Sequence, residues 1–93
     1  MDRYWTAAYA IFDLPVLASK RSVLLSYVDE SRHEIDWRGI SETMGAWSHG
    51  EQVLVRIAHA LFNDGDEVAI HELSVLSPDV GRAVLQIIAR RYW

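Results

Sequence analysis

The chain has 93 residues, of which 51% are hydrophobic, a formal net charge of -4 and no cysteine. This length supports one core, so we expect a single helical domain over residues 1–93, and the lack of cysteine excludes disulfides, thiolate catalysis and cysteine-bound zinc. Residues 1–76 hold six Lys/Arg and twelve Asp/Glu, whereas residues 77–93 hold three Arg and one Asp, and this acidic balance disfavours direct binding to nucleic acid.

The first segment predicts a helix over residues 3–12. Trp5, Ala8, Tyr9 and Phe12 recur at helical spacing and form one apolar stripe. The first five residues lack the basic and then apolar pattern of a secretory signal, and no apolar run approaches the roughly 20 residues that a membrane helix needs. We therefore expect a cytoplasmic protein without membrane contact.

A second helix is expected from Pro15 onward, because Pro disfavours continuing the first helix but is tolerated in the first turn of the next. Its apolar residues spread around the helix, which predicts a central position. Residues 29–42 lose this pattern, and we interpret them as an acidic loop anchored by Ile35, Trp37 and Ile40. The alternation at 35–37 is typical of a short extended piece, and residues 40–44 allow a helical turn.

The clearest local signal is a capping box at Ser48 and Glu51, in which each side chain accepts a hydrogen bond from the main chain of the other. Trp47 precedes it and is expected to pack back on the first turn. The helix that follows has an apolar stripe of Val53, Leu54, Ile57, Ala58, Leu61 and Phe62. Its opposite stripe, which we expect to face solvent, consists of Gln52, Arg56, His59 and Asn63. Asn63, Asp64 and Gly65 predict its end.

Residues 69–76 predict a short helix with Ile70, Leu73 and Leu76 directed inward, although residues 68–70 also fit a brief strand. Ser77 and Pro78 are typical of an N-cap and first helical position. The last helix has the stripe Val80, Ala83, Val84, Ile87 and Ile88, with Arg90 and Arg91 at its C-terminal end. Five helices with short connections predict an all-α fold, a compact orthogonal bundle of about five short helices.

The chain is poorly equipped for catalysis or metal binding. The four histidines (His33, His49, His59 and His71) contain no pair four residues apart and no His-Glu-x-x-His motif. Ser48, His49 and Glu51 have the residue types of a hydrolytic triad, but neighbours on one helical turn point in different directions. No glycine-rich phosphate loop is present. We therefore predict no enzyme, no catalytic residue, no metal ligand and no cofactor.

Two acidic segments are the candidate partner-binding residues. They are Asp29, Glu30, Glu34, Asp36 and Glu42 in the first segment, and Asp64, Asp66, Glu67 and Glu72 in the second. Such clusters are ordinarily a solvated face. As a binding surface they would attract a basic protein partner, for example a host complex that itself binds nucleic acid.

Two other functions stay open. Residues 70–93 have the parts of a helix-turn-helix, in which Arg82, Gln86 and Arg90 would form one exposed row for phosphates and base edges, or simply a solvated face. The aromatic residues near both ends (Tyr4, Trp5, Tyr92 and Trp93) either pack together or form a contact surface. The second alternative would suit a homo-oligomeric structural or assembly subunit.

The run from Trp47 to Asn63, with its Trp-Ser-x-Gly-Glu cap and amphipathic helix, and the tail Ile88-Ala89-Arg90-Arg91-Tyr92 together resemble segments of a family of small uncharacterised bacterial and prophage proteins. The resemblance covers the second half of the chain closely and the first half loosely, and it brings no catalytic residues. It implies a small, phage-borne accessory protein. With the acidic segments, it leads to our first hypothesis, a non-catalytic protein-binding module that inhibits a host defence complex of the CRISPR type.

Overall fold

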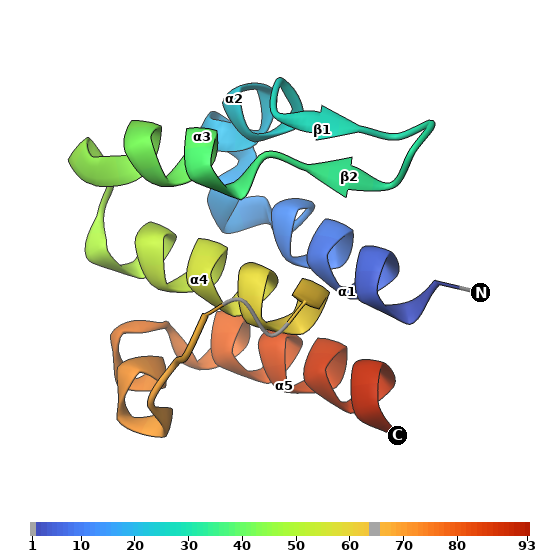
Figure 1. The fold of residues 1–93 in the computed structure, drawn as a ribbon. Coiled ribbons are helices and arrows are strands. Elements are labelled where there is room, and N and C mark those ends of the chain that lie inside the picture. Colours follow the sequence, from blue (N-terminus) through green and yellow to red (C-terminus); the bar gives the residue numbers. More distant parts are fainter. Residues whose placement is uncertain (1, 64–65) are drawn as a thin grey trace.

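The computed structural model describes residues 2–63 and 66–93, and within them the fold is helical apart from one very short hairpin (Figure 1). In chain order the elements are α1 (Arg3–Phe12), η1 (Pro15–Lys20), α2 (Arg21–Leu25), β1 (Val28–Asp29), β2 (Glu34–Ile35), α3 (Trp37–Thr43), η2 (Met44–Ala46), α4 (His49–Asn63), η3 (Ile70–Val75) and α5 (Pro78–Tyr92). The η elements are 3₁₀-helices. The predicted all-α class is confirmed.

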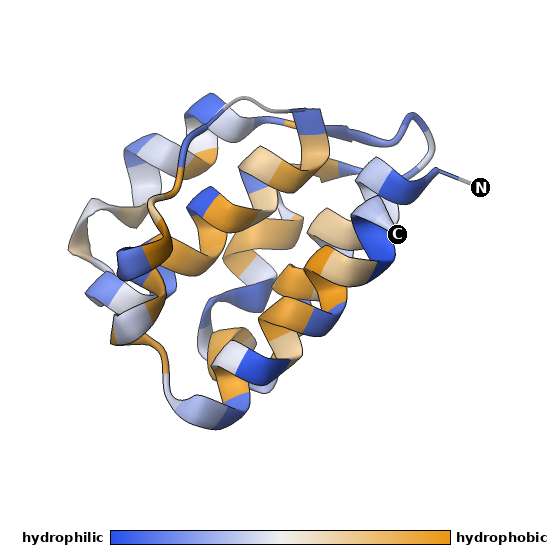
Figure 2. Ribbon diagram, turned by 90° about the horizontal axis from the view of Figure 1, so that it is seen from below, coloured by the Kyte–Doolittle hydropathy of each residue, from blue (hydrophilic) through white to orange (hydrophobic). Residues whose placement is uncertain are grey.

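The core forms where α1 packs against both α4 and α5. Figure 2 shows the hydrophobic stretches along these helices, and their buried residues form one cluster. The largest fully buried side chains are Ile11, Phe12, Leu17, Leu24, Ile40, Val53, Leu54 and Val84. No polar or charged residue is classed as buried among those that the structure describes, so every ion pair of that part lies at or near the surface.

Side-chain caps begin the three longest helices, and the sequence predicts two of them, at Ser48 and Ser77. Asp2 accepts a hydrogen bond from the Trp5 main chain, which places the start of α1 at Arg3. At α4, the Ser48 N–H donates to Glu51 over 3.0 Å and the Glu51 N–H donates to Ser48 Oγ over 3.2 Å, so the capping box is confirmed. At α5, Ser77 Oγ accepts from the Val80 N–H.

The loop expected over residues 29–42 is wrong, because this stretch folds into a hairpin and a helix, but the helical turn allowed at residues 40–44 is present within α3 and η2. Strands β1 and β2 pair antiparallel, with Val28 opposite Ile35, and His33 adopts a left-handed backbone conformation at the turn (φ 52°). Asp36 then accepts a hydrogen bond from the Gly39 N–H over 3.0 Å and starts α3. Local N-capping therefore makes a helix where the density of charge indicated a loop.

The expected anchors of this stretch do face inward. Ile40 is fully buried, Ile35 and Trp37 pack against the core, and Trp37 meets Phe12 with ring centroids 5.7 Å apart. Trp37 also stacks on His59 of α4 at 4.5 Å. The prediction that His59 lies on a solvent-exposed face is wrong, because Trp37 of α3 covers that part of α4.

Two expected helices are 3₁₀-helical in part or entirely. The helix from Pro15 starts as η1 and becomes α-helical only at Arg21. Over residues 69–76 the chain forms η3, where Leu73 and Leu76 pack against the core but Ile70 is 86% exposed. The inward position predicted for Ile70 is wrong. Ile70 lies one 3₁₀ turn before Leu73, and both residues line a surface groove in which Ile70 stays exposed to solvent. Within the described ranges, no helix is long and apolar enough to cross a membrane.

Candidate functional site: two acidic segments and an arginine groove

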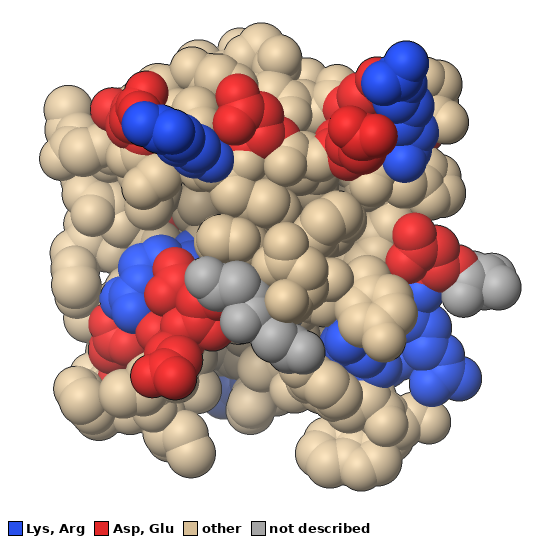
Figure 3. Space-filling view, viewed as in Figure 1, with Lys and Arg blue, Asp and Glu red and all other residues tan. Residues whose placement is uncertain are grey.

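The first acidic segment lies along one edge of the molecule, formed by the hairpin and α3. Figure 3 shows its acidic side chains spaced along this edge, with basic side chains beside some of them. All five predicted residues of the segment are exposed: Asp29, Glu30, Glu34, Asp36 and Glu42. Two arginines, Arg32 and Arg38, belong to the same stretch, which leaves it a formal charge of -3. We call this surface the acidic edge.

Two carboxylates of the acidic edge hold the local fold. Asp29 accepts hydrogen bonds from the Ser31 hydroxyl over 2.7 Å and from the Arg32 N–H over 3.2 Å, and the bond from Ser31 is the main reason that the pKa of Asp29 is lowered. Asp36 caps α3 through its bond to Gly39. These contacts set the hairpin turn and the start of the helix.

The other three carboxylates are directed outward. Glu30 accepts a hydrogen bond from the Tyr9 hydroxyl over 2.8 Å, which raises the pKa of Tyr9. Glu42 lies 3.3 Å from Arg38 in an exposed pair. Glu34 is exposed on β2 and makes no side-chain hydrogen bond or ion pair within residues 2–63 and 66–93. The acidic edge therefore retains charge that the molecule does not neutralise.

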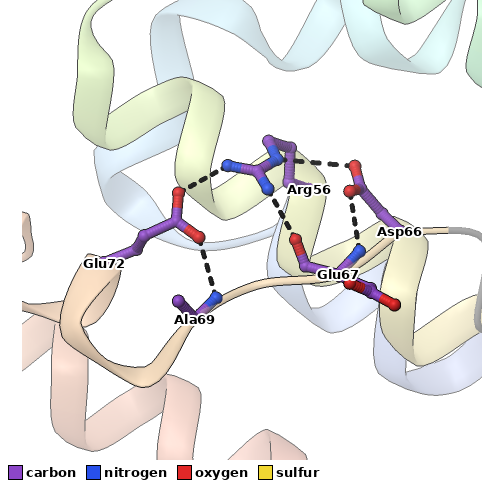
Figure 4. Close-up of polar contacts among 5 residues, drawn as sticks. All are labelled: Arg56, Asp66, Glu67, Ala69 and Glu72. Atoms are coloured by element: carbon purple, nitrogen blue, oxygen red, sulfur yellow. Dashed lines mark hydrogen bonds and ion pairs between the residues drawn. The ribbon is translucent and has the colours of Figure 1, made fainter.

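The second acidic segment is organised around Arg56 of α4, as Figure 4 shows. The Nη1 atom of Arg56 lies 2.6 Å from Glu72 Oε1, and its Nε atom lies 3.5 Å from Asp66 Oδ2. The Nη2 atom donates to the main-chain carbonyl of Glu67. Glu72 also accepts from the Ala69 N–H over 2.8 Å, and this bond, more than Arg56, lowers the pKa of Glu72.

Arg56 thus binds the strap of residues 66–72 to α4. The side chains of Arg56, Asp66 and Glu72 are 31%, 30% and 18% exposed, so the carboxylates of Asp66 and Glu72 face an internal partner. Glu67 is exposed and takes part only through its main chain. Asp64 lies outside the described residues. Arg56 is the sole Lys or Arg between Arg38 and Arg82, and that isolation was the available sequence signal for its role.

The predicted row on α5 is exposed at all three positions, Arg82, Gln86 and Arg90. Arg82 pairs with Asp79 at 3.1 Å, within the first turns of the helix. The element before α5 is the six-residue 3₁₀-helix η3, whereas a helix-turn-helix places an α-helix there. The row by itself has the form of an ordinary solvated face.

Two of the four histidines, His33 and His59, have structural partners. His33 Nδ1 lies 3.2 Å from Asp2, and its ring stacks on Trp5 at 4.6 Å. Burial against Trp37 and its neighbours lowers the pKa of His59. Throughout residues 2–63 and 66–93, no three His, Asp or Glu side chains form a group that could hold a metal ion.

The terminal aromatic residues were expected either to pack together or to form a contact surface, and the structure has features of both. Arg91 of α5 lies over the ring of Tyr4 at 3.8 Å and over that of Tyr92 at 4.5 Å, and Trp5 is half-buried against His33. Trp93, by contrast, is 88% exposed. The ends of α1 and α5 therefore pack together and still leave Tyr4, Tyr92 and Trp93 exposed, Trp93 most of all.

Arginines gather at that same end of the molecule, where the N-terminal end of α1 meets the C-terminal end of α5 (Figure 3). Arg3, Arg90 and Arg91 line a groove between these helices. Sequence reasoning assigned Arg90 to the α5 row and did not connect it with Arg3. The connection depends on the packing of α1 against α5.

No family model matches the chain, and no curated protein or solved structure is significantly similar to it. The resemblance carried by residues 47–63 and 88–92 stays a prediction. Function is therefore inferred from the surface itself.

Proposed function

We propose that the protein is a non-catalytic protein-binding module whose acidic edge docks a basic partner. The observation that carries this function is the placement of five exposed carboxylates on one edge with a formal charge of -3. Charge of one sign that is left unpaired at a surface attracts partners of the opposite sign and raises the rate of encounter.

The rigidity of the acidic edge supports this function. The Tyr27 hydroxyl and Thr43 Oγ1 share a hydrogen bond of 2.7 Å, which ties the end of α3 to the chain just before the hairpin. Tyr9 and Asp2 of the N-terminal segment contact Glu30 and His33 of the hairpin. A surface held in place loses less conformational entropy when a partner binds.

The second segment contributes less charge to such a surface than its sequence indicates, because Arg56 already pairs with Asp66 and Glu72. Glu67 is the residue of that segment whose exposed carboxylate is not used in these contacts. We therefore assign partner binding first to Glu30, Glu34 and Glu42 on the acidic edge.

The specific form of the proposal is a phage-borne inhibitor of a CRISPR-type or other nucleic-acid-binding host complex. A row of carboxylates presents negative charge to a basic groove as a nucleic-acid backbone does, so the acidic edge would compete for that groove. The resemblance of residues 47–63 and 88–92 to prophage proteins favours this context. The net charge of -4 also makes binding to another acidic molecule through this edge unfavourable.

The test compares two variants with the same change of charge. The edge variant is Glu34→Gln with Glu42→Gln, and the control is Asp13→Asn with Asp79→Asn, two exposed positions outside both acidic segments. Tagged proteins are used to capture partners from host lysate with and without nuclease, and each captured partner is purified for titration against all three forms.

We expect to capture a basic, nucleic-acid-binding protein that stays bound after nuclease treatment. This partner should release its nucleic acid when the module binds. Its affinity should fall about tenfold or more for the edge variant and stay near the wild-type value for the control. Equal weakening of both variants would remove the acidic edge as the site. Recovery of DNA alone, lost with Arg82→Gln and Gln86→Ala, would favour the helix-turn-helix alternative, and concentration-dependent oligomers with no external partner would favour the assembly subunit.

A further inference from the structure

Six of the nine Lys and Arg side chains are paired with a carboxylate at 2.6–3.9 Å. They are Lys20, Arg21, Arg32, Arg38, Arg56 and Arg82. The other three, Arg3, Arg90 and Arg91, form no ion pair with any residue in the described part of the chain. All three line the same groove between α1 and α5.

This arginine groove has a volume of about 190 Å³. Its floor is formed by small or aliphatic residues, Ala7, Ala10 and Ile87, with Thr6 beside them, and no carboxylate contributes to its lining. Ala7 and Ile87 belong to the core. A large apolar side chain that entered the groove would therefore extend an existing apolar surface, with three guanidinium groups around it.

Arg91 is already held in position for a ligand. Its Nε atom donates to the Leu61 carbonyl over 2.9 Å, and its guanidinium lies against the rings of Tyr4 and Tyr92. These contacts leave the two terminal nitrogens of the guanidinium as donors. A guanidinium with a fixed plane suits paired hydrogen bonds to a carboxylate and loses little freedom when it forms them.

The local charge makes the groove exceptional in this molecule. The chain has thirteen Asp and Glu, so without the three groove arginines its formal charge would be -7. The groove gathers three guanidinium groups into one region of an acidic protein, with the Asp2 carboxylate beside Arg3 and Arg91 in the neighbouring depression. Two copies that met groove to groove would bring like charges together, so charge disfavours a symmetric dimer through this face.

We propose that the arginine groove binds an acidic peptide segment of a partner protein, with one large apolar side chain on the groove floor and carboxylates on Arg3, Arg90 and Arg91. An aliphatic floor suits such a side chain, whereas proteins that bind single-stranded nucleic acid stack bases on free aromatic faces. Here Arg91 already lies over one face of Tyr4 and of Tyr92. This site is separate from the acidic edge and does not depend on it.

The experiment uses a displayed library of random dodecapeptides, selected on the full-length folded protein. Enriched peptides are synthesised with a fluorescent label and titrated against the wild type and two charge-matched variants. Arg3→Gln with Arg90→Gln removes two groove arginines that have no ion-pair partner among the described residues, and Arg32→Gln with Arg38→Gln removes two exposed arginines of the acidic edge. Ala10→Met fills the floor without a change of charge.

We expect the enriched peptides to combine two or more Asp or Glu with a neighbouring large apolar residue. Their affinity should fall about tenfold or more with the groove variant and with Ala10→Met, and remain within about twofold for the control. Circular dichroism confirms that each variant folds. Peptide copies with amides in place of carboxylates should lose binding.

Three results would overturn the proposal. The first is a selection that yields no acidic peptides, and the second is peptide affinity that is insensitive to Arg3→Gln with Arg90→Gln. The third is a DNA duplex or phosphatidylglycerol vesicle that binds through these arginines while acidic peptides do not, which would assign the groove to phosphate instead. None of these results affects binding at the acidic edge, whose variants lie elsewhere.

Discussion

Two glycines in first turns of helices should respond with opposite sign to the same substitution. At Gly81 of α5, an added β-carbon would meet no atom within 4 Å. At Gly39 of α3, it would lie 2.5 Å from Cε1 of Tyr27 and 2.7 Å from Oδ2 of Asp36. Distances this short cannot persist, so Gly39→Ala must displace the Tyr27 ring, the Asp36 cap or α3 itself.

The magnitudes follow from these surroundings. Gly81→Ala should raise the free energy of unfolding by about 0.5–1 kcal/mol, because alanine favours the helix and restricts the unfolded chain. Gly39→Ala gains the same amount but overpacks the contact with Tyr27, which costs about 1–3 kcal/mol. It also strains the 2.7 Å hydrogen bond of Tyr27 with Thr43, worth about 1 kcal/mol. We expect a net loss of about 2 kcal/mol.

Urea denaturation followed by circular dichroism and tryptophan fluorescence measures both changes. A third variant isolates the cause: when the ring is removed by Tyr27→Ala, adding Gly39→Ala should cost much less, since only the short contact with Asp36 Oδ2 is left. The reasoning is refuted if Gly39→Ala is as stable as the wild type, or if its cost is the same with and without the Tyr27 ring.

Three further predictions concern polar contacts. Arg56→Met should lower the free energy of unfolding by about 2 kcal/mol because the strap of residues 66–72 loses its charged hydrogen bonds, whereas Arg82→Met, whose pair is exposed, should change it by less than about 0.5 kcal/mol in the same urea assay. Ser48→Ala should cost about 1 kcal/mol through loss of the N-cap, and Ser41→Ala, an exposed position within α3, should not destabilise. Main-chain N–H donors hold the pKa of three carboxylates below their ordinary values (Asp2, Glu51 and Glu72). As the pH falls below about 4.5 the unfolded chain therefore takes up these protons before the folded one. The stability that these three carboxylates contribute should be fully present above that pH and be lost as the pH drops through their folded pKa values, and Arg56→Met should flatten this decline.

The parts of the fold that could be predicted are those with signals a few residues apart. Ser48 with Glu51, Ser77 before Pro78, and the apolar stripe from Trp5 to Phe12 depend on local geometry alone, and the structure has all three helices. The same reasoning was available for α3, since Asp36 lies three residues before Gly39 and caps it. Five acidic residues in fourteen positions concealed that cap and favoured a loop.

The candidate surfaces depend on contacts that no local pattern contains. Arg56 is 16 residues from Glu72, and their ion pair exists only because the strap returns across α4. From the charge along the chain, Asp66 and Glu72 were assigned to a binding partner, whereas Arg56 of α4 already pairs with both carboxylates.

The arginine groove also depends on contacts between residues that are far apart in the sequence. Arg3 and Arg90 are brought together by the packing of α1 on α5, although they lie near opposite ends of the sequence. Together with Arg91 they place three guanidinium groups in one groove of a protein whose net charge is -4. At physiological ionic strength, exposed charges act over about 8 Å, so a docking partner responds to the surface it touches more than to the total. The acidic edge and the arginine groove should therefore bind partners of opposite charge, and replacing the arginines of one should leave the affinity of the other nearly unchanged.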